Sequence, residues 1–212
     1  KFIGNLKLCD VKEKSNTNLN SKQIKFFNSK NIILTGYSTH QTEENFCAEI
    51  FKNLRNNKNQ ILILIPRHVE RANLIEKDLK SKNLFVHRHS SNQKIHQSTD
   101  VYLVDTYGET KKFLGLSKVV FAGGSLIPHG GQNPLDVVRN NSIVIHGPNI
   151  GNFKEVYKFL SQEKISFKFN NMKQAINLIK NKNSVNQNAK LKLNKISSKI
   201  LTKTKMELFK YV

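Results

Sequence analysis

The feature that most constrains the fold is a regular alternation of short apolar runs with amphipathic segments over residues 31–146. The run at 61–65 contains only Ile and Leu and is ended by Pro66, which is typical of a parallel strand covered on both faces. Further strands are predicted at 31–36, 84–87, 101–104, 119–122 and 142–146. Helices are predicted at 42–57, 70–82, 107–116 and 134–140. This alternation predicts an α/β fold: a Rossmann-like, mostly parallel sheet with helices on both faces.

The sequence on either side of this region is different. Residues 1–30 are predicted to be an interdomain link and a polar loop with a short helix, and residues 31–170 the Rossmann-like domain. Residues 171–212 are predicted to form a basic helical tail on or beside that domain, from Ile176 and Ile179 and then Leu193, Ile196 and Ile200 at helical spacing. No apolar run approaches the roughly 20 residues that span a bilayer, and the start of the sequence has no signal-peptide pattern.

The chain is strongly basic, with 35 Lys and Arg against 15 Asp and Glu and a formal net charge of +20. More than half of that charge lies in residues 151–212, which hold 14 Lys and 3 Glu. Such a balance indicates an anionic partner, which could be a phosphorylated substrate, nucleic acid or an acidic membrane surface. The alternative is a general compositional drift toward Lys and Asn, with no partner involved. Nucleic acid is disfavoured, because the aromatic residues are not interleaved with basic ones and no helix-turn-helix or zinc-finger spacing occurs.

Cysteine and histidine spacing gives no indication of a metal. Cys9 and Cys47 match no metal or redox motif, and free thiols are typical of a reducing, cytosolic compartment. The histidines at 87, 89 and 96 do not fit a closed zinc site. We therefore expect neither a metal nor another cofactor.

A glycine-rich loop follows the apolar run at 119–122. The pairs 123–124 and 130–131 flank a Ser-Leu-Ile-Pro-His connector, and glycine lets a backbone approach a ligand closely. A helix is predicted to begin near Pro134, with Asn133 as its N-cap. Loop and helix start together indicate a phosphate-binding corner, with Asp136 accepting hydrogen bonds from ribose hydroxyls. The alternative is simple turn chemistry.

Polar residues also follow two other predicted strands, and ligands of such sheets bind outside the carboxyl ends of the strands. The guanidinium of Arg67 suits a phosphate or a carboxylate, and His68 could bind the nucleotide or cap a loop. Ser38, Thr39 and His40 could contact the same ligand, or form a turn in which Ser38 or Thr42 caps the next helix. All of these loops are expected to converge on one crevice.

Three glutamates near predicted helix starts have two interpretations. Glu43 and Glu44 could form an acid–base pair, but glutamates in a first turn normally interact with the helix dipole, and we favour that role for both. Glu109 lies at the start of its own predicted helix, where ligand binding and a helix-dipole role are both open.

Several motifs together resemble the donor site of bacterial Kdo (3-deoxy-D-manno-octulosonic acid) transferases. That family typically reads D-T-x-G-E, here at 105–109, and F-x-G-G-S-L-x-P-x-G-G-H-N-P-L-E, here at 121–136. Residues 38–44 resemble its S-T-H-x-x-E-E, residues 65–71 its V-P-R-H-P-E-R, residues 2–6 its interdomain G-N-L-K, and residues 146–153 its F-G-P-x-x-x-N-F. The sequence departs from the pattern at Val69 for Pro, Gln132 for His and Asp136 for Glu.

The resemblance implies one half of a GT-B glycosyltransferase, the C-terminal domain that holds CMP-Kdo. The whole enzyme would transfer Kdo with inversion to a lipid A precursor at the cytoplasmic face of the bacterial inner membrane. Its catalytic base, a Glu, is expected in the N-terminal acceptor domain, which this sequence lacks. The residues implied in nucleotide-sugar binding are Arg67, His68, Thr106, Gly108, Glu109, Gly123, Gly124, Ser125, Gly130, Gly131, Gln132, Asn133 and Asp136. Ser38, Thr39 and His40 are implied as further contacts to phosphate or Kdo.

Two other functions remain open at this point. One is a different GT-B sugar-nucleotide transferase or an epimerase, which would share the glycine-rich loop and a ribose carboxylate. The other is a non-enzymatic basic module that binds anionic membrane or nucleic acid, for which the net charge is the only indication.

Overall fold

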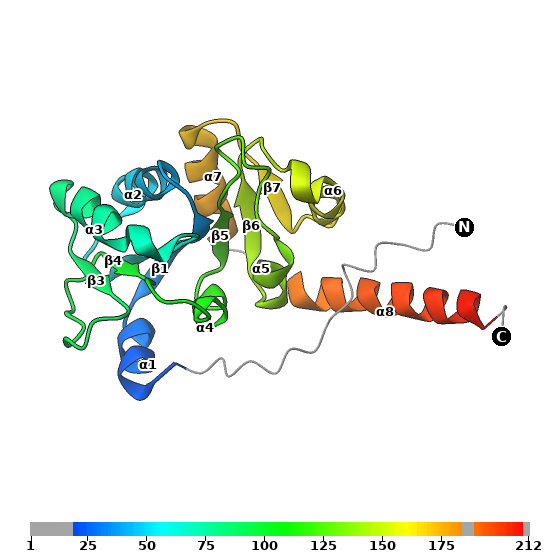
Figure 1. Cartoon of the computed structure of the whole chain (residues 1–212), viewed down its shortest axis with the longest axis horizontal. Coiled ribbons are helices and arrows are strands. Elements are labelled where there is room, and N and C mark those ends of the chain that lie inside the picture. Colours follow the sequence, from blue (N-terminus) through cyan, green and yellow to red (C-terminus); the bar gives the residue numbers. More distant parts are fainter. Residues whose placement is uncertain (1–18, 184–188, 210–212) are drawn as a thin grey trace.

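A computed structural model describes residues 19–183 and 189–209; the segment at 2–6 and Cys9 lie outside the described residues. The described strands form one sheet of seven, in the order β3-β4-β2-β1-β5-β6-β7, and every pair is parallel (Figure 1). The strands are β1 (Asn31–Thr39), β2 (Gln60–Pro66), β3 (Val86–Arg88), β4 (Val101–Leu103), β5 (Val119–Ala122), β6 (Ile143–His146) and β7 (Ser166–Lys168). The α/β fold class is thereby confirmed.

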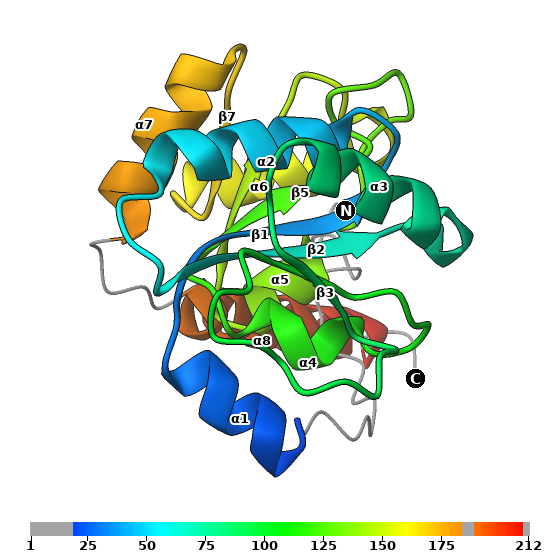
Figure 2. The same ribbon diagram turned by 90° about the vertical axis from the view of Figure 1, so that its left-hand side faces the viewer.

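Helices cover both faces of the sheet (Figure 2). The α2 face carries α2 (Glu43–Leu54), α3 (Ala72–Ser81) and α7 (Met172–Asn183). The opposite face carries α1 (Ser21–Asn28), α4 (Thr110–Leu114), α5 (Leu135–Arg139), α6 (Lys154–Gln162) and α8 (Ala189–Leu208). Strand β2 supplies both cores, with Ile63 on one side and Leu64 on the other, which is why its sequence is apolar without interruption.

Most boundaries agree with the sequence predictions, and a few elements differ. Helices α4 and α5 have five residues each, shorter than predicted, and β1 continues three residues beyond its predicted end at Gly36. Two short 3-10 helices, η2 (Val69–Arg71) and η3 (Gly151–Phe153), precede α3 and α6. Helix α6 and strand β7 were not predicted. Strand β7 has a weak sequence signal, because it is a three-residue edge strand with only Ser166 fully buried.

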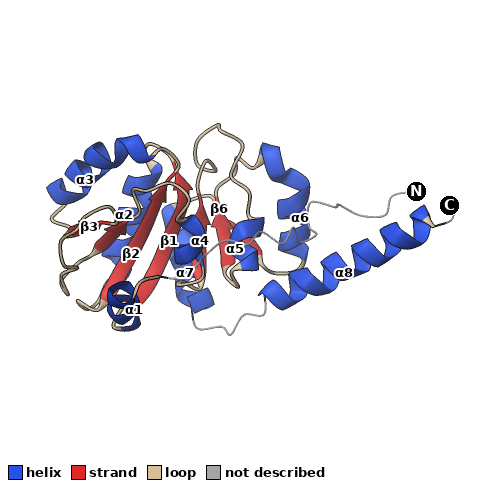
Figure 3. Cartoon of the chain, turned by 60° about the horizontal axis from the view of Figure 1, so that its bottom comes forward, coloured by secondary structure: helices blue, strands red, loops and turns tan. Residues whose placement is uncertain are grey.

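The tail is helical, as predicted, but its two helices are placed differently. Helix α7 belongs to the core through Ala175 and Ile179, whereas α8 packs through Leu193 and Ile200 and then extends away from the sheet (Figure 3). The side chain of Ile196 lies outside the described residues. Within the described residues, none of the helices combines the length and apolar character of a membrane span.

The order of the strands fixes where a ligand can enter. From β1 the chain moves to β2 on one side and later returns to β5 on the other, so the topology reverses between β1 and β5. In parallel sheets, ligands bind at the carboxyl edge beside such a reversal. The turn at 38–42 and the glycine-rich loop at 123–134 lie at this edge, and the region that they border is called the crevice below.

Candidate functional site

The glycine-rich loop lies directly against the turn that follows β1. The amide of Gly123 donates to the carbonyl of Tyr37 at 2.8 Å. A Cβ at Gly123 would lie 2.2 Å from the carbonyl oxygen of Ser38 and 2.7 Å from the Cα of Thr39. Only glycine lets the two backbones approach this closely, so this glycine is needed for contact between the loops.

Glu43 joins the same two loops. Its side chain is fully buried, and its carboxylate accepts hydrogen bonds from the amides of His40 (2.9 Å), Gly124 (2.7 Å), Ser125 (3.1 Å) and Leu126 (3.0 Å). Glu43 does lie in the first turn of α2, but the expected helix-dipole role is incomplete, because the carboxylate also binds another loop 81–83 positions along the chain.

Two further expectations about this helix start are settled by the structure. Thr42 is the N-cap residue, but it has a left-handed backbone (φ 77°) and its side chain makes no capping hydrogen bond. Ser38 lies too far back to be the cap residue, so the predicted side-chain cap is absent at both positions. Glu44 forms a bidentate pair with Arg71 at 2.9 and 3.3 Å, so its carboxylate is also bound within the protein.

Ser125 is fully buried between the glycine-rich loop and the loop after β6. Its hydroxyl donates to the carbonyl of Ala122 at 2.6 Å and accepts from the amide of Gly147 at 3.0 Å. With the amides of Gly124 and Ser125 bound to Glu43, the groups expected to hold a phosphate here are already paired inside the chain. These residues shape the loop.

A histidine cluster occupies the crevice above Gly124. The ring of His40 lies 4.3 Å from that of His129 and 5.7 Å from that of His68, centroid to centroid. The side-chain amide of Gln132 is 3.1 Å from Nε2 of His40. Burial, followed by the positive charges of His129, His68, Arg67 and Arg71, lowers the pKa of His40 to about 4. His40 is therefore neutral at physiological pH.

Arg67 follows β2 at the edge of this cluster, and its amide donates to the carbonyl of Thr39 at 2.9 Å. The other arginines of the chain pair with carboxylates: Arg55 with Asp100, Arg71 with Glu44, Arg88 with Asp105 and Arg139 with Asp136. Among the described residues, Arg67 is the arginine without a carboxylate partner, and its side chain is exposed. Thr39 is fully buried, so it supports Arg67 through its backbone.

Asp136 faces the same crevice from α5. Burial, and next the carboxylate of Asp136, raise the pKa of Tyr37 to about 12, and Tyr37 lies within hydrogen-bonding reach of that carboxylate. Asp136 Oδ1 is also 3.6 Å from Nη1 of Arg139. Sequence reasoning missed Tyr37, because a tyrosine at the end of a strand reads as a core residue.

The start of α5 differs slightly from the prediction. The helix begins at Leu135, and Pro134 precedes it in the N-cap position with a helical backbone. The predicted N-cap, Asn133, instead accepts from the amide of Leu135 at 3.1 Å through Oδ1. Because α5 has only five residues, its dipole contributes little to a phosphate site.

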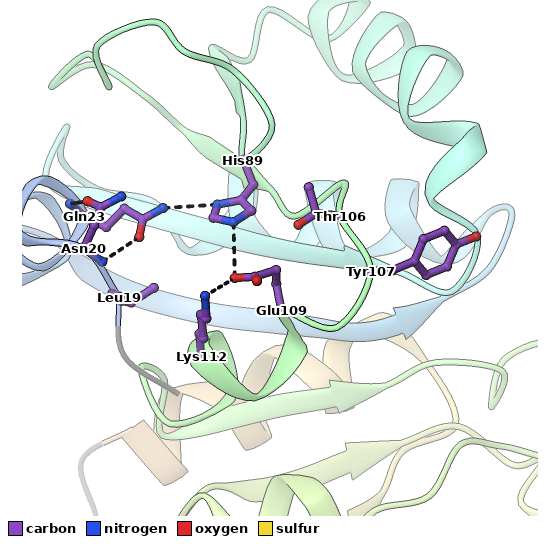
Figure 4. A pocket seen from close by; sticks show the side chains of 8 residues that line it. All are labelled: Leu19, Asn20, Gln23, His89, Thr106, Tyr107, Glu109 and Lys112. Carbon is purple, nitrogen blue, oxygen red and sulfur yellow. Dashed lines mark hydrogen bonds and ion pairs between the residues drawn. The ribbon is translucent and has the colours of Figure 1, made fainter. Parts of the chain in front are cut away.

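The loop after β4 opens into a neighbouring pocket of about 410 Å³ (Figure 4). In it, Glu109 Oε2 lies 2.5 Å from Lys112 Nζ and 3.5 Å from His89 Nε2. The hydroxyl oxygen of Thr106, which also lines the pocket, is buried without a hydrogen-bond partner among the described residues. Gly108 has a left-handed backbone (φ 78°) in the same loop.

Tyr107, which lines this pocket, is linked to the loop after β2 by hydrogen bonding. Its hydroxyl donates to Glu70 Oε2 at 3.1 Å, and Glu70 Oε1 is 3.2 Å from Nδ1 of His68. The loops after β1, β2, β4 and β5 are therefore linked by contacts at one edge of the sheet, whereas their convergence on one ligand site stays a prediction. His129 contacts His40 in this cluster but was not predicted, because it stands at a variable position inside the glycine motif.

The loop after β6 packs on the glycine-rich loop from the other side. The Asn152 amide donates to the carbonyl of Gly130, and its side chain donates to the carbonyl of His129, both at 3.0 Å. The amide of Gly131 donates to the carbonyl of Gly124 at 2.9 Å.

Over residues 19–183 and 189–209, no group of three or more His, Cys, Asp or Glu is arranged to hold a metal ion.

Comparison with known proteins gives a consistent group of relatives. The chain is 36% identical over 124 residues to a 3-deoxy-D-manno-octulosonic acid transferase of Haemophilus influenzae, and 33% identical over 173 residues to one of Rickettsia conorii. These matches cover 58% and 80% of the chain but only 29% and 36% of the relatives. The chain thus spans about a third of the length of these relatives. No protein-family profile matches it.

A solved structure matches nearly end to end. The C-terminal CMP-Kdo binding domain of WaaA from Acinetobacter baumannii superposes with a TM-score of 0.73 and 30% identity, covering 84% of this chain and 93% of that domain. The kitacinnamycin glycotransferase, at 10% identity and a TM-score of 0.52, shares the fold alone. The chain therefore belongs to the Kdo transferase family and has the fold of its C-terminal domain.

Proposed function

We propose that this chain is the donor-binding domain of a Kdo transferase and that it binds CMP-Kdo in the crevice between β1 and β5. The observation that carries the proposal is Arg67, an arginine without a carboxylate partner among the described residues, beside a cluster of histidines. A cationic, hydrogen-bonding surface at the switch point of a parallel sheet is suited to a nucleotide phosphate. The similarity to a CMP-Kdo binding domain supports the same ligand.

The phosphate is the group whose charge changes during transfer. When the bond from phosphate to the anomeric carbon breaks, CMP leaves and negative charge accumulates on the phosphate oxygens. The guanidinium of Arg67 stabilises that charge directly, and His68 of the same loop and His129 of the glycine-rich loop add donors. The fold brings these side chains to the same edge of the sheet.

The nucleoside has polar partners on either side of the phosphate site. Asp136, held by Tyr37 and Arg139, accepts hydrogen bonds from the ribose hydroxyls. The cytosine base of the nucleotide extends toward the neighbouring pocket and passes the loop at 106–109, where the hydroxyl of Thr106 has no hydrogen-bond partner among the described residues. Gln132 and Asn133 border the crevice from the glycine-rich loop.

The remaining parts of the reaction belong to the whole enzyme. The acceptor, a lipid A precursor, and the general base, a glutamate, are assigned to an N-terminal domain that pairs with this one. Transfer inverts the configuration at the anomeric carbon. The lysines of residues 151–212 hold the domain at the anionic cytoplasmic surface of the inner membrane.

Titration calorimetry tests the proposal. CMP is expected to bind more tightly than UMP, and Arg67→Ala is expected to weaken CMP binding by about 1–3 kcal/mol, the scale of a charge-assisted hydrogen bond. Lys77→Ala, on α3, is the control and should leave affinity unchanged. Equal or better binding of UMP would reject the Kdo assignment in favour of another sugar nucleotide, and unchanged affinity in Arg67→Ala would remove Arg67 from the site.

A further inference from the structure

Three consecutive amides of the glycine-rich loop point at a single group. The N–H groups of Gly124, Ser125 and Leu126 converge on the carboxylate of Glu43, and Gly124 adopts a left-handed backbone (φ 65°) to allow it. Such a run of N–H groups is an anion receptor of the kind that binds phosphate in many nucleotide sites. Here the chain's own carboxylate fills it.

The carboxylate is saturated in this position. Oε1 accepts from Ser125 and Leu126, and Oε2 accepts from Gly124 and His40, which uses the roughly four acceptor positions of a carboxylate. Burial raises the pKa of Glu43, and these four amides oppose the rise. A second anion would meet the negative charge of Glu43 and find no free donor there.

The filled receptor lies directly beneath the histidine cluster. A Cβ at Gly124 would be 3.1 Å from Cδ2 of His129 and 3.5 Å from Nε2 of His40. Glu43 binds both segments that carry these histidines, the turn at 38–42 and the loop at 123–131. A shift of Glu43 would therefore change the distance between the two rings.

We infer that Glu43 is a positioning residue, an internal anion that fixes the two loops that carry His40 and His129. As a consequence, the phosphate of the donor is bound by side chains, among them Arg67, and not by the amides of residues 124–126. This inference rests on the proposed function for its ligand. Its structural part, the carboxylate bound by three loop amides, stands independently of which nucleotide binds.

The variant Glu43→Gln tests the role with little change of shape. The amide keeps one acceptor oxygen but turns an N–H₂ group toward two N–H donors. We expect the dissociation constant for CMP to rise at least about tenfold, the equivalent of one lost charge-assisted hydrogen bond. Glu49→Gln removes the same charge from α2, where Glu49 pairs with Lys82, and should leave CMP affinity within about twofold. Wild-type affinity in Glu43→Gln would overturn the inference.

Amide spectra of the 212-residue chain separate positioning from simple stability. In the ligand-free wild type, the amide protons of residues 124–126 should resonate downfield and exchange slowly, and Glu43→Gln should abolish both properties. On addition of CMP to the wild type, these three amides should change little while the imidazole signals of His40 and His129 move. If the three amides show the largest shifts instead, the phosphate displaces Glu43 and the inference is wrong. This outcome is readable even if Glu43→Gln does not fold.

The two proposals fail in different ways. If the wild type does not bind CMP, the proposed function fails, while the ligand-free spectra still test the carboxylate–amide contact. If CMP binds and the ligand-free amides show neither property, the role of Glu43 fails and the proposed function stands.

Discussion

Replacing Gly123 with Ala should damage both the fold and the candidate site, and the size of the effect follows from the geometry. The new Cβ would lie 2.2 Å from the Ser38 carbonyl oxygen, 2.7 Å from the Ser38 carbonyl carbon and 2.7 Å from the Thr39 Cα. All three are backbone atoms, so no side chain can rotate away. The Ser38 oxygen must retreat by about 1 Å to reach ordinary contact.

That displacement occurs where β1 and β5 pair, at Tyr37 and Ala122, and where Gly123 donates to Tyr37. Overpacking of this kind costs about 1–3 kcal/mol, and we expect the upper end because the obstruction is backbone. For a chain of this size about 3 kcal/mol corresponds to a fall in Tm of roughly 6–12 °C. CMP binding should fall as well, because Ser38 and His40 move with the turn.

Gly151→Ala is the matched control. A Cβ at Gly151 meets no atom within 4 Å and its backbone is not left-handed, so its Tm should be unchanged or slightly higher. Thermal unfolding followed by circular dichroism, with calorimetric titration of CMP, measures both effects. If Gly123→Ala melts within 2 °C of the wild type, the loops are not in contact as described and the reasoning about this crevice is refuted.

Three further predictions follow from charge and domain content. The pKa of His40 is about 4 in the folded chain and near 6.5 in the unfolded one, so the unfolded chain takes up the proton first and stability falls as pH drops from 6.5 to 4. Urea unfolding at pH 7 and pH 5 should show a smaller loss of stability in His40→Gln than in the wild type. In a sedimentation assay, the Lys-rich residues 151–212 should bind vesicles of anionic lipid more tightly than neutral vesicles, by about 1 kcal/mol for each lysine near the surface, and salt should weaken this binding. Equal binding to both kinds of vesicle would mean that the charge only reflects the composition of the chain. The 212-residue chain should bind CMP without transferring Kdo, and fusing it behind the N-terminal half of a homologous Kdo transferase should restore transfer. If the chain alone transfers Kdo and His40→Ala abolishes that activity, the catalytic base lies in this chain.

The sheet was predictable because a strand buried on both faces has a distinctive local signal. β2 contains the run of Ile and Leu at 61–65 before Pro66, and β5 and β6 contain short apolar runs followed by polar or glycine-rich loops. The edge strand β7 lacks that signal, since only one of its three residues is fully buried. Helix α4 was overextended because Tyr107 and Leu116, which the structure places in turns, continue its apolar spacing, whereas α5 was overextended by one residue at each end.

The loops of the site were predictable, but the partners inside it were not. The residue types after β1, β2, β4 and β5 predicted a ligand site at one edge of the sheet, because parallel strands bring these loops together. Glu43 illustrates the limit. Its local context, the first turn of a helix, favoured a helix-dipole role, and no local pattern reports that its carboxylate binds amides more than 80 positions away. Tyr37 was missed for the same reason, since its link to Asp136 is a tertiary contact.

The charge of the whole chain does not locate the site; the pairing of individual charges does. A net charge of +20 spreads over many exposed lysines and would suit almost any anion. The arginines are more selective, because four of the five are neutralised by Asp or Glu within the fold. The remaining one, Arg67, adjoins a loop whose amide receptor is already occupied by Glu43. Because Glu43 already binds the amides of this loop, they are not available to a phosphate, and the guanidinium of Arg67 and the histidine side chains remain as donors. Gln132 contacts His40 but adds no charge. The affinity for phosphate should therefore depend chiefly on Arg67.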